Sequence, residues 1–411
     1  MDLDLDEETL RFRDEARAWL RANVPATPLP SLDTAEGFEA HRTWERRLGE
    51  ARWSAVSWPA EYGGRDASLL QWVVFEEEYY RADAPARVSQ NGVFLLAPIM
   101  FEHGTDEQRA RFLPRMATGD DIWAQAWSEP EAGSDLAAIR SSATRVEGGW
   151  HLRGQKTWSS RAAFADWGFG LFRSDPGAER HRGLTYFLFP LDAEGVTVRP
   201  IAQLDGETGF AEIFLDDVFV PDADVLGEVG AGWKVAMSTA GSERGLSLRS
   251  PGRFLATADR LVDLWRRTSP SRGATWLSSG PETPPGRATR EAEPAPSALD
   301  ERVADAWIAA QAYRLHTFGT VTRLADGGAI GAEASLGKLF WSELDVALHE
   351  TALDLLGADA ELAPGSRDAV DDGRWLDGYL FALAGPIYAG TNEIQRNVVA
   401  ERVLGLPRGP R

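Results

Sequence analysis

The hydrophobic pattern of this chain changes its period twice, and that order of patterns limits the folds it can adopt. At first, as in 6–23, apolar residues recur at the three- and four-residue spacing of amphipathic helices. Residues 121–226 hold short aromatic or β-branched runs between Gly, Asp and Pro, as antiparallel strands do. Helical spacing then returns. We therefore expect an α+β multidomain protein, with an all-helical domain over 1–120, an antiparallel β-barrel-like domain over 121–226 and a helical bundle over 227–411.

The individual elements follow from the same patterns. In the N-terminal part the expected helices span 6–23, 35–51, 68–82, 92–102 and 105–117. The expected strands span 150–152, 157–159, 169–172, 184–189, 196–200 and 211–219, and the later helices span 232–267, 299–325, 331–356 and 369–384, before a last one in the tail. Pro251 is expected to kink or interrupt the first of these later helices. The proline-rich segment 269–298 is expected to be a long loop inside the bundle.

Composition narrows the possible functions. The chain of 411 residues has a net charge of −20, which disfavours nucleic acid and anionic membranes as partners. It has no cysteine, and its six histidines form no pair at metal-binding spacing, so we expect no metal site. The N-terminal sequence MDLDLDEETL lacks the apolar core of a signal peptide, and no apolar run could span a membrane, so the expected location is cytoplasmic. The glycine motifs of Rossmann and P-loop sites are absent, so any cofactor must be held by another device.

The tail stretch 386–402, PIYAGTNEIQRNVVAER, combines a turn with a helix start. Gly390 allows a tight turn, and Thr391 and Asn392 are of the residue types that cap helices. Gln395 lies three positions after Asn392, as in a capping box. The backbone N–H groups at such a helix start suit an anionic or strongly accepting group. On these features alone, an ordinary capped surface helix is the preferred interpretation.

Several stretches of the sequence resemble the acyl-CoA dehydrogenase family, in the order in which the family has them. They are EHGTDEQRARFLPRMATGD (102–120), WSEPEAGSDL (127–136), GQKTWSS (154–160), GLTYFLFPLDAEGVTVRPI (183–201), FAEIFLDDVFVPDADVLGEVGAGWKVAM (210–237), KLFWSE (338–343) and IYAGTNEIQRNVVAERVLGLPR (387–408). The resemblance covers essentially the whole chain and extends to actinobacterial members, among them those that degrade steroid side chains. It implies an acyl-CoA dehydrogenase-like fold.

The resemblance also implies a reaction and its partners. The family desaturates an acyl-CoA thioester between its α and β carbons: a carboxylate removes the α-proton, and FAD takes the β-hydrogen as hydride. Because the α-proton is only weakly acidic, the site must stabilise the enolate-like charge on the thioester oxygen. We therefore expect an FAD-dependent acyl-CoA dehydrogenase that passes electrons to an electron-transferring flavoprotein. It is expected to form a homo- or hetero-oligomer, either a dimer or a tetramer.

Two of the matching stretches would face the flavin. The resemblance makes Trp127, Ser128 and Ser134 the expected contacts in one of them, and Trp158 and Ser160 those in the other. Without the resemblance, the first stretch would be interpreted as a turn, because EPEAGSD is rich in turn formers. The second would be interpreted as a cross-strand aromatic pair with a surface serine. Because both stretches match in register, we prefer the flavin interpretation.

The resemblance places the catalytic base outside the tail. Many members carry a Glu where this chain has Ala389, whose methyl group cannot accept a proton. The branch that resembles isovaleryl- and long-chain-acyl-CoA dehydrogenases instead has a Glu before an Arg on the helix after the β-domain, which here corresponds to Glu243-Arg244. We expect Glu243 to be the base, Arg244 an adjacent positioning charge, and the Ala389 backbone amide to polarise the thioester carbonyl. The alternative for Glu243 is a solvent-facing helix glutamate.

Other parts of the chain bear on how FAD is held. Thr391 and Glu393 match family positions that approach FAD from the side of a neighbouring subunit. The family's Arg-x-x-Phe-Gly element, which grips the FAD of the neighbour, is replaced by RRTSPSRGATW, and the adenine-side loop is thinned to LLGADAEL (355–362). FAD is therefore expected to be held differently, less tightly, or with help from a partner subunit.

Three functions stay open from the sequence. The leading one is an FAD-dependent acyl-CoA dehydrogenase for a branched or bulky acyl group. The second is a non-catalytic subunit of a mixed tetramer. The third is a redirected enzyme of the same fold: a flavin oxidase, a flavin hydroxylase or a dehydrogenase for carrier-protein-bound acyl groups.

Overall fold

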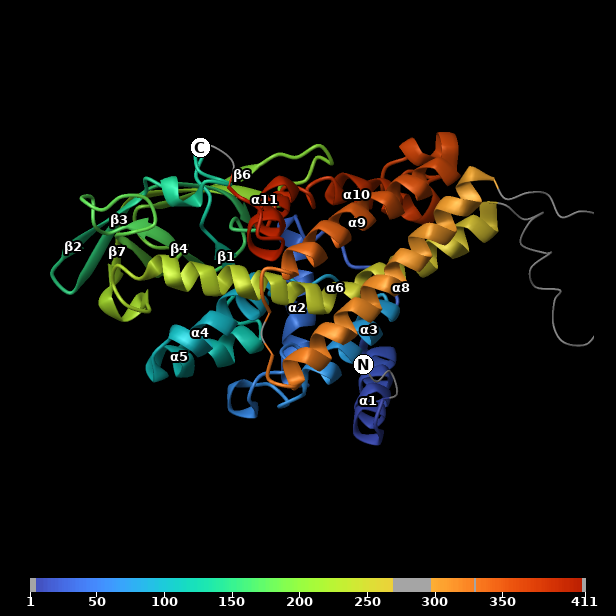
Figure 1. Ribbon diagram of the computed structural model, residues 1–411, viewed down its shortest axis with the longest axis horizontal. Coiled ribbons are helices and arrows are strands. Elements are labelled where there is room, and N and C mark those ends of the chain that lie inside the picture. Colours follow the sequence, from blue (N-terminus) through green and yellow to red (C-terminus); the bar gives the residue numbers. More distant parts are fainter. Residues whose placement is uncertain (1–4, 269–296, 329, 409–411) are drawn as a thin grey trace, which may run out of the picture. The chain divides into compact units, whose positions relative to one another are not determined.

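The computed structural model describes residues 5–268, 297–328 and 330–408, and of 239–250 the backbone only. The chain divides into two compact units, 2–248 and 249–411 (Figure 1). The first unit holds the N-terminal helices and the sheet, and the second unit holds the later helices.

Capped helices make up the first part of the first unit. They are α1 Glu7–Asn23, α2 Ala35–Glu50, α3 Leu69–Arg81, α4 Ala97–His103 and α5 Asp106–Ala117. The side chains of Asp6, Thr34, Ser68 and Thr105 accept hydrogen bonds from the first turns of α1, α2, α3 and α5. Polar residues ahead of the apolar runs thus start these helices. The helix expected over 92–102 is in part a π-helix, Asn91–Leu96, that leads directly into α4.

A buried ion pair lies among these helices. Arg87 and Glu45 are both almost fully buried, with 2.9 Å between Arg87 Nε and Glu45 Oε1. Arg87 also donates to the Ser54 carbonyl at 2.7 Å, and Glu45 accepts from the Ser89 amide at 3.3 Å. A buried charge is tolerated only when it is paired, so each of the two side chains depends on the other.

A single sheet follows these helices. Its strands are β1 Trp123–Gln125, β2 Ser142–Val146, β3 Gly149–Ser160, β4 Trp167–Arg173, β5 Leu184–Pro190, β6 Val196–Ile201, β7 Phe210–Pro221 and β8 Val225–Leu226. They pair in the order β6-β7-β3-β2-β4-β5-β8, with β1 beside β4 (Figure 1). β4 runs parallel to β1 and β2, and the other pairs are antiparallel. No pairing among the described strands joins β6 to β8, so the expected central sheet is present as an open sheet rather than a closed barrel.

The strand boundaries differ from the expected ones at two points. The runs at 150–152 and 157–159 belong to the single strand β3, whose register with β7 shifts between Lys156 and Ser159. β1, β2 and β8 were not predicted. β1 and β8 have only three and two residues, too few for the alternation of a strand to show.

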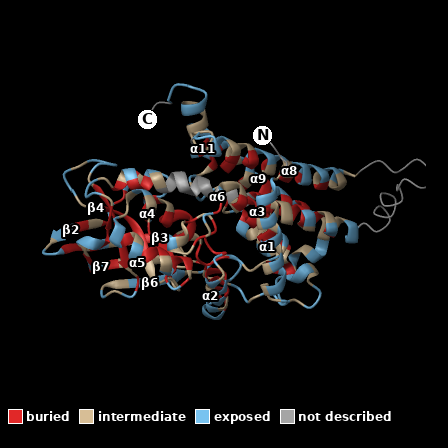
Figure 2. Cartoon of the chain, turned by 90° about the horizontal axis from the view of Figure 1, so that it is seen from below, coloured by how far each residue is buried: buried red, intermediate tan, exposed pale blue. Residues whose placement is uncertain are grey.

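Both faces of the centre of the sheet are buried (Figure 2). On one face, Phe169 and Leu171 of β4 belong to a core that includes Phe112 of α5. On the other, Phe172 of β4 meets Phe187 of β5 edge-on, with ring centroids 5.8 Å apart. Burial on two faces explains why β4 and β5 are continuous apolar runs rather than alternating ones.

The second unit is helical. Its elements after α6 Gly232–Thr268, which runs into it from the first unit, are α8 Ala298–Ala325, α9 Ala334–Leu356, α10 Arg374–Ala382 and α11 Asn392–Val398. α6 continues through Pro251, so the helix is not interrupted there. Phe254 of α6 packs with Tyr313 of α8 and Leu348 of α9 in the core of this unit. The expected loop over 269–298 lies, except for its last two residues, outside the described part of the chain. None of the described helices combines the length and the apolar character that crossing a bilayer requires.

We expect Glu45→Gln to lower the free energy of unfolding by about 3–5 kcal/mol, because it removes the carboxylate that is hydrogen-bonded to the buried Arg87 cation. Chemical denaturation measures this loss. Glu39→Gln is the control, because it removes the partner of Arg46 in a more exposed ion pair of the same helix. Equal losses in the two variants would contradict the role given to burial.

Candidate functional site

Two segments that are distant in sequence lie side by side in the first unit. The predicted flavin contacts Trp127 and Ser128 directly follow β1, and Trp158 and Ser160 lie in β3. The Thr157 amide donates to the Ser128 carbonyl at 2.9 Å, which joins the two segments directly. Trp127 Nε1 donates to the Tyr186 hydroxyl at 3.2 Å, so β5 holds this indole. The structure therefore brings these four residues into one region of the sheet.

Trp158 occupies an irregular point of β3. It lies within the register shift between β3 and β7, and its φ of 59° is in the left-handed region that bulky residues rarely adopt. The indole is 59% exposed and meets Phe210 edge-on, with centroids 6.0 Å apart. The cross-strand aromatic pair is therefore present. The bulge also turns the indole away from the core. A planar ligand can therefore pack against its exposed face.

Hydroxyl groups accompany the two indoles. None of the residues that the structure describes forms a hydrogen bond with the hydroxyl of Ser128, Ser134 or Ser160. Ser134 lies exposed just beyond a tight turn in which Glu129 and Ala132 exchange backbone hydrogen bonds of 3.1 and 3.0 Å. A flavin has aromatic faces that suit indoles and polar edge atoms that suit hydroxyls. The residues present in these segments therefore fit FAD.

Sequence reasoning did not single out two charged residues of these segments, Lys156 and Glu129. The Lys156 ammonium is fully buried and lies 2.9 Å from Glu129 Oε1. The strand pattern gave no signal for Lys156, because the same strand also carries His151 and the exposed Arg153.

The tail of the second unit forms a left-handed turn before α11. Ala389 and Gly390 have φ values of 55° and 79°. The side-chain amide of Gln395 donates to the carbonyls of both residues, at 2.9 and 3.3 Å. Thr391 is the N-cap of α11, and its hydroxyl accepts from the Ile394 amide at 3.3 Å. The turn and its capping threonine are thus as expected.

Asn392 has a different role from the expected one. It is the first residue of α11, and its Oδ1 accepts from Lys338 Nζ at 2.7 Å and from the Ser342 hydroxyl at 3.1 Å. The capping box expected between Asn392 and Gln395 is wrong, because Thr391 is the N-cap and the Asn392 backbone amide donates to the Pro386 carbonyl at 2.8 Å. Burial lowers the pKa of Lys338 to about 8, against the opposing pull of Glu393. Two side chains of α9 thus anchor the start of α11.

The backbone amide of Ala389 stays available in this turn. Among the described residues none accepts a hydrogen bond from it. A left-handed φ is less favourable for Ala than for Gly, and such strain is concentrated where a backbone group serves a ligand. Glu393 lies exposed on α11, and hydrogen bonds from its own backbone amide and from Thr391 lower its pKa. The tail therefore offers one N–H donor and one ionised carboxylate.

Glu243 and Arg244, the predicted base and its neighbouring charge, belong to α6. Their side chains lie outside the described residues, so their roles stay predictions. The helix that carries them follows the last strand of the sheet, as the sequence indicates.

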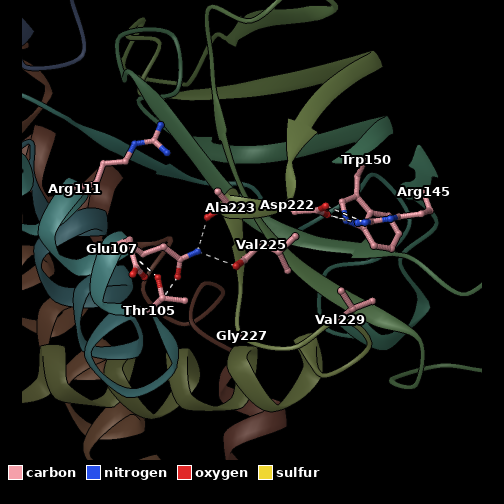
Figure 3. A pocket seen from close by; sticks show the side chains of 11 residues that line it. Thr105, Glu107, Arg111, Arg145, Trp150, Asp222, Ala223, Val225, Gly227 and Val229 are labelled. Carbon is pink, nitrogen blue, oxygen red and sulfur yellow. Dashed lines mark hydrogen bonds and ion pairs between the residues drawn. The ribbon is translucent and has the colours of Figure 1, made fainter. Parts of the chain in front are cut away.

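A cavity of about 920 Å³ lies elsewhere in the first unit, near the start of α5 and the strands β2 and β3 (Figure 3). None of the predicted site residues lines it. The two arginines that line it are paired, Arg145 with Asp222 and Arg111 with Asp224, and Asp222 also accepts from Trp150 Nε1 at 3.2 Å. No described group of three or more His, Asp or Glu side chains could hold a metal ion there or at any other described position. The cavity is therefore a weaker candidate site than the two segments and the tail turn.

Known proteins match the whole chain. Family models for the acyl-CoA dehydrogenase N-terminal, middle and C-terminal domains match residues 6–120, 124–218 and 292–404. The acyl-CoA dehydrogenase IpdE1 of Mycolicibacterium smegmatis is 38% identical, over 98% of this chain and 98% of its own. IpdE1 of Mycobacterium tuberculosis is also 38% identical, over 98% and 99%.

Solved structures agree with this match. The steroid ACAD Tcur3481-Tcur3483 has a TM-score of 0.81 and 27% identity, over 100% of both chains. A chain of the ChsE4-ChsE5 complex from Mycobacterium tuberculosis has a TM-score of 0.77 and 28% identity, again over 100% of both. Acyl-CoA dehydrogenases are oxidoreductases with FAD as their cofactor, which the two segments of the sheet fit. On these matches, this chain belongs to the acyl-CoA dehydrogenase family.

Proposed function

We propose that this chain desaturates an acyl-CoA thioester between its α and β carbons, on a branched or bulky acyl group such as a steroid side chain. The observation that carries the proposal is the left-handed turn at Ala389, which presents an amide N–H without a carboxylate. FAD, when bound, accepts the β-hydrogen as hydride. The similarity to a steroid ACAD along the full chain supports the proposed class of acyl group.

In this proposal one group of the chain removes the α-proton and another stabilises the charge on the thioester oxygen. The Glu243 carboxylate removes the α-proton, with Arg244 beside it as a positioning charge. The Ala389 amide donates to the thioester oxygen, where negative charge develops as the proton leaves. Since the Ala389 side chain cannot take a proton, the base has to come from another element, and Glu243 matches the position that one branch of the family uses.

The remaining predicted residues hold the cofactor in this proposal. Those of the first unit, Trp127, Ser128, Ser134, Trp158 and Ser160, contact the flavin, and those of the tail, Thr391 and Glu393, approach FAD across a subunit boundary. Electrons then pass to an electron-transferring flavoprotein. A homo- or hetero-oligomer follows from the shared site, and the two-chain complex among the similar solved structures supports a mixed assembly.

An anaerobic screen of flavin reduction tests the function. The FAD-loaded protein is mixed with short, branched, long and steroid acyl-CoA thioesters, and loss of the flavin absorbance is followed in a stopped-flow spectrometer. We expect the fastest reduction with the bulky thioesters. A lone chain that binds no flavin would point instead to a non-catalytic subunit, and peroxide formation in air would point to an oxidase. Flavin that no thioester reduces, but that a separate reductant does, would indicate a hydroxylase.

Glu243→Gln is expected to slow flavin reduction by about 10²–10⁴-fold, the range that a positioned general base contributes. The FAD content should stay at the wild-type level, because the amide keeps the size of the side chain. Glu147→Gln, in the exposed turn between β2 and β3, is the matched control and should reduce normally. Normal reduction in Glu243→Gln would show that the base lies elsewhere.

Ala389→Gly is expected to keep flavin reduction near the wild-type rate, because it retains the N–H and suits a left-handed φ better, with up to about 1 kcal/mol gained in stability. Gln395→Leu should slow reduction about tenfold, because it frees both carbonyls of the turn and lets the amide reorient. Stopped-flow reduction and thermal unfolding measure the two effects. If Ala389→Gly abolished reduction, the methyl group rather than the amide would be required.

A further inference from the structure

Lys156 is a fully buried cation between the two flavin-contacting segments. Its ammonium donates to Glu129 Oε1 at 2.9 Å, to the Leu171 carbonyl at 2.8 Å and to the Trp127 carbonyl at 3.5 Å. The Phe172 ring centroid lies 4.6 Å from the same nitrogen. Each of the three N–H groups therefore has an acceptor, and the ammonium is confined to one place.

Glu129 is fixed on its other side as well. Its carboxylate accepts from the Arg140 amide at 2.6 Å and from the Ser141 amide at 3.0 Å, just before β2 begins. Burial raises the pKa of this carboxyl, but the charge of Lys156 and the two amides outweigh burial and hold the pKa below its ordinary value. Burial lowers the pKa of Lys156, and Glu129 opposes that change. The carboxylate is therefore ionised at neutral pH and can serve as the counter-charge.

The ion pair lies where both segments change direction. Glu129 starts the tight turn that directly follows Trp127 and Ser128. Lys156 is the last residue of β3 before the bulge that turns Trp158 outward. A displacement of either partner would therefore move one set of flavin contacts relative to the other.

We propose that the Lys156–Glu129 ion pair is a positioning device of the flavin site, which sets the spacing between the Trp127-Ser128 segment and the Trp158–Ser160 segment and thereby the strength of FAD binding. The inference rests on the flavin contacts proposed for these segments. Both partners act through their neighbours rather than on the reacting atoms. An apolar pair could fill the same volume, but it would lack the directed hydrogen bonds that fix the distance between turn and strand.

The test removes both charges together. Lys156→Met/Glu129→Leu leaves no orphaned buried charge, so it separates positioning from stability. The matched control is Arg87→Met/Glu45→Leu, at another buried ion pair of the first unit. Three quantities are measured on each full-length protein: the FAD dissociation constant of the apoprotein, the visible circular dichroism of the bound flavin, and the thermal unfolding midpoint of the apoprotein.

We expect the FAD dissociation constant of Lys156→Met/Glu129→Leu to rise at least about tenfold, the size of effect that loss of supporting contacts has at metal sites, with an altered flavin dichroism. The control should change neither quantity, at a similar unfolding midpoint. An unchanged dissociation constant and dichroism in Lys156→Met/Glu129→Leu would overturn the proposal. Equal loss of FAD affinity in the control would overturn it too, because flavin loss would then follow from general destabilisation.

Glu129→Asp keeps the proposal testable if the double variant does not fold. It retains the counter-charge of Lys156 but shortens the reach of the carboxylate by one methylene, so FAD binding should weaken in the same direction, and wild-type affinity and dichroism would overturn the proposal. These readouts need no substrate. A protein whose flavin no acyl-CoA reduces would refute the proposed function, while the comparison of FAD affinities would still decide the role of the ion pair.

Discussion

A cation that leaves water must find a fixed counter-charge, and the sheet of this protein meets that condition for Lys156 with one carboxylate and two carbonyls. One of these carbonyls belongs to Leu171 in β4, a strand whose interior residues are all buried. The ion pair is therefore tied to a fully buried part of the sheet as well as to the turn after β1. Apolar packing fixes β4, β4 fixes the ammonium, and the ammonium fixes Glu129 and the turn that it begins.

In the tail, hydrogen-bonding groups rather than an ion pair hold the backbone in place. A left-handed pair of residues leaves two carbonyls that need donors, and the single amide of Gln395 supplies both. With its carbonyl satisfied, Ala389 keeps an N–H that no described residue uses. Asn392, held by Lys338 and Ser342, fixes the other end of the turn to α9. The orientation of this backbone donor thus depends on four side chains that do not have to contact a substrate.

The sequence was informative wherever the signal is local. The N-caps Asp6, Thr34, Ser68 and Thr105 each precede an apolar repeat, and the helices begin there. Local signals failed where pairing with distant residues decides the outcome. β1 and β8 exist because β4 and β5 offer them partners, although their own residues are too few to show a period. Likewise, Gln395 stands at capping-box spacing from Asn392, but the Asn392 backbone amide donates to the distant Pro386 carbonyl instead.

The candidate site shows the same contrast between local signals and contacts with distant residues. Family motifs located the segments around Trp127 and Trp158, because each motif is contiguous in sequence. The ion pair that joins them could not be predicted from spacing, since Lys156 finds its acceptors in a turn and in a neighbouring strand only once the sheet has formed. Once the structure is known, burial distinguishes Lys156 from the other basic residues of β3, because a lysine is seldom buried unless a partner offsets its desolvation.

The proposed reaction explains why the tail can lose its carboxylate without losing its turn. Stabilising charge on the thioester oxygen requires a donor at a fixed point, and a backbone amide supplies it whatever the side chain is. Removing the α-proton requires only a carboxylate within reach of the α-carbon, which any neighbouring element can carry. The donor acts on the thioester oxygen and the base acts at the α-carbon. The residue that serves as base can therefore lie on a different element from the left-handed turn. In the proposed reaction the left-handed turn at Ala389 therefore supplies the donor for the thioester oxygen, and the carboxylate that removes the α-proton comes from another element.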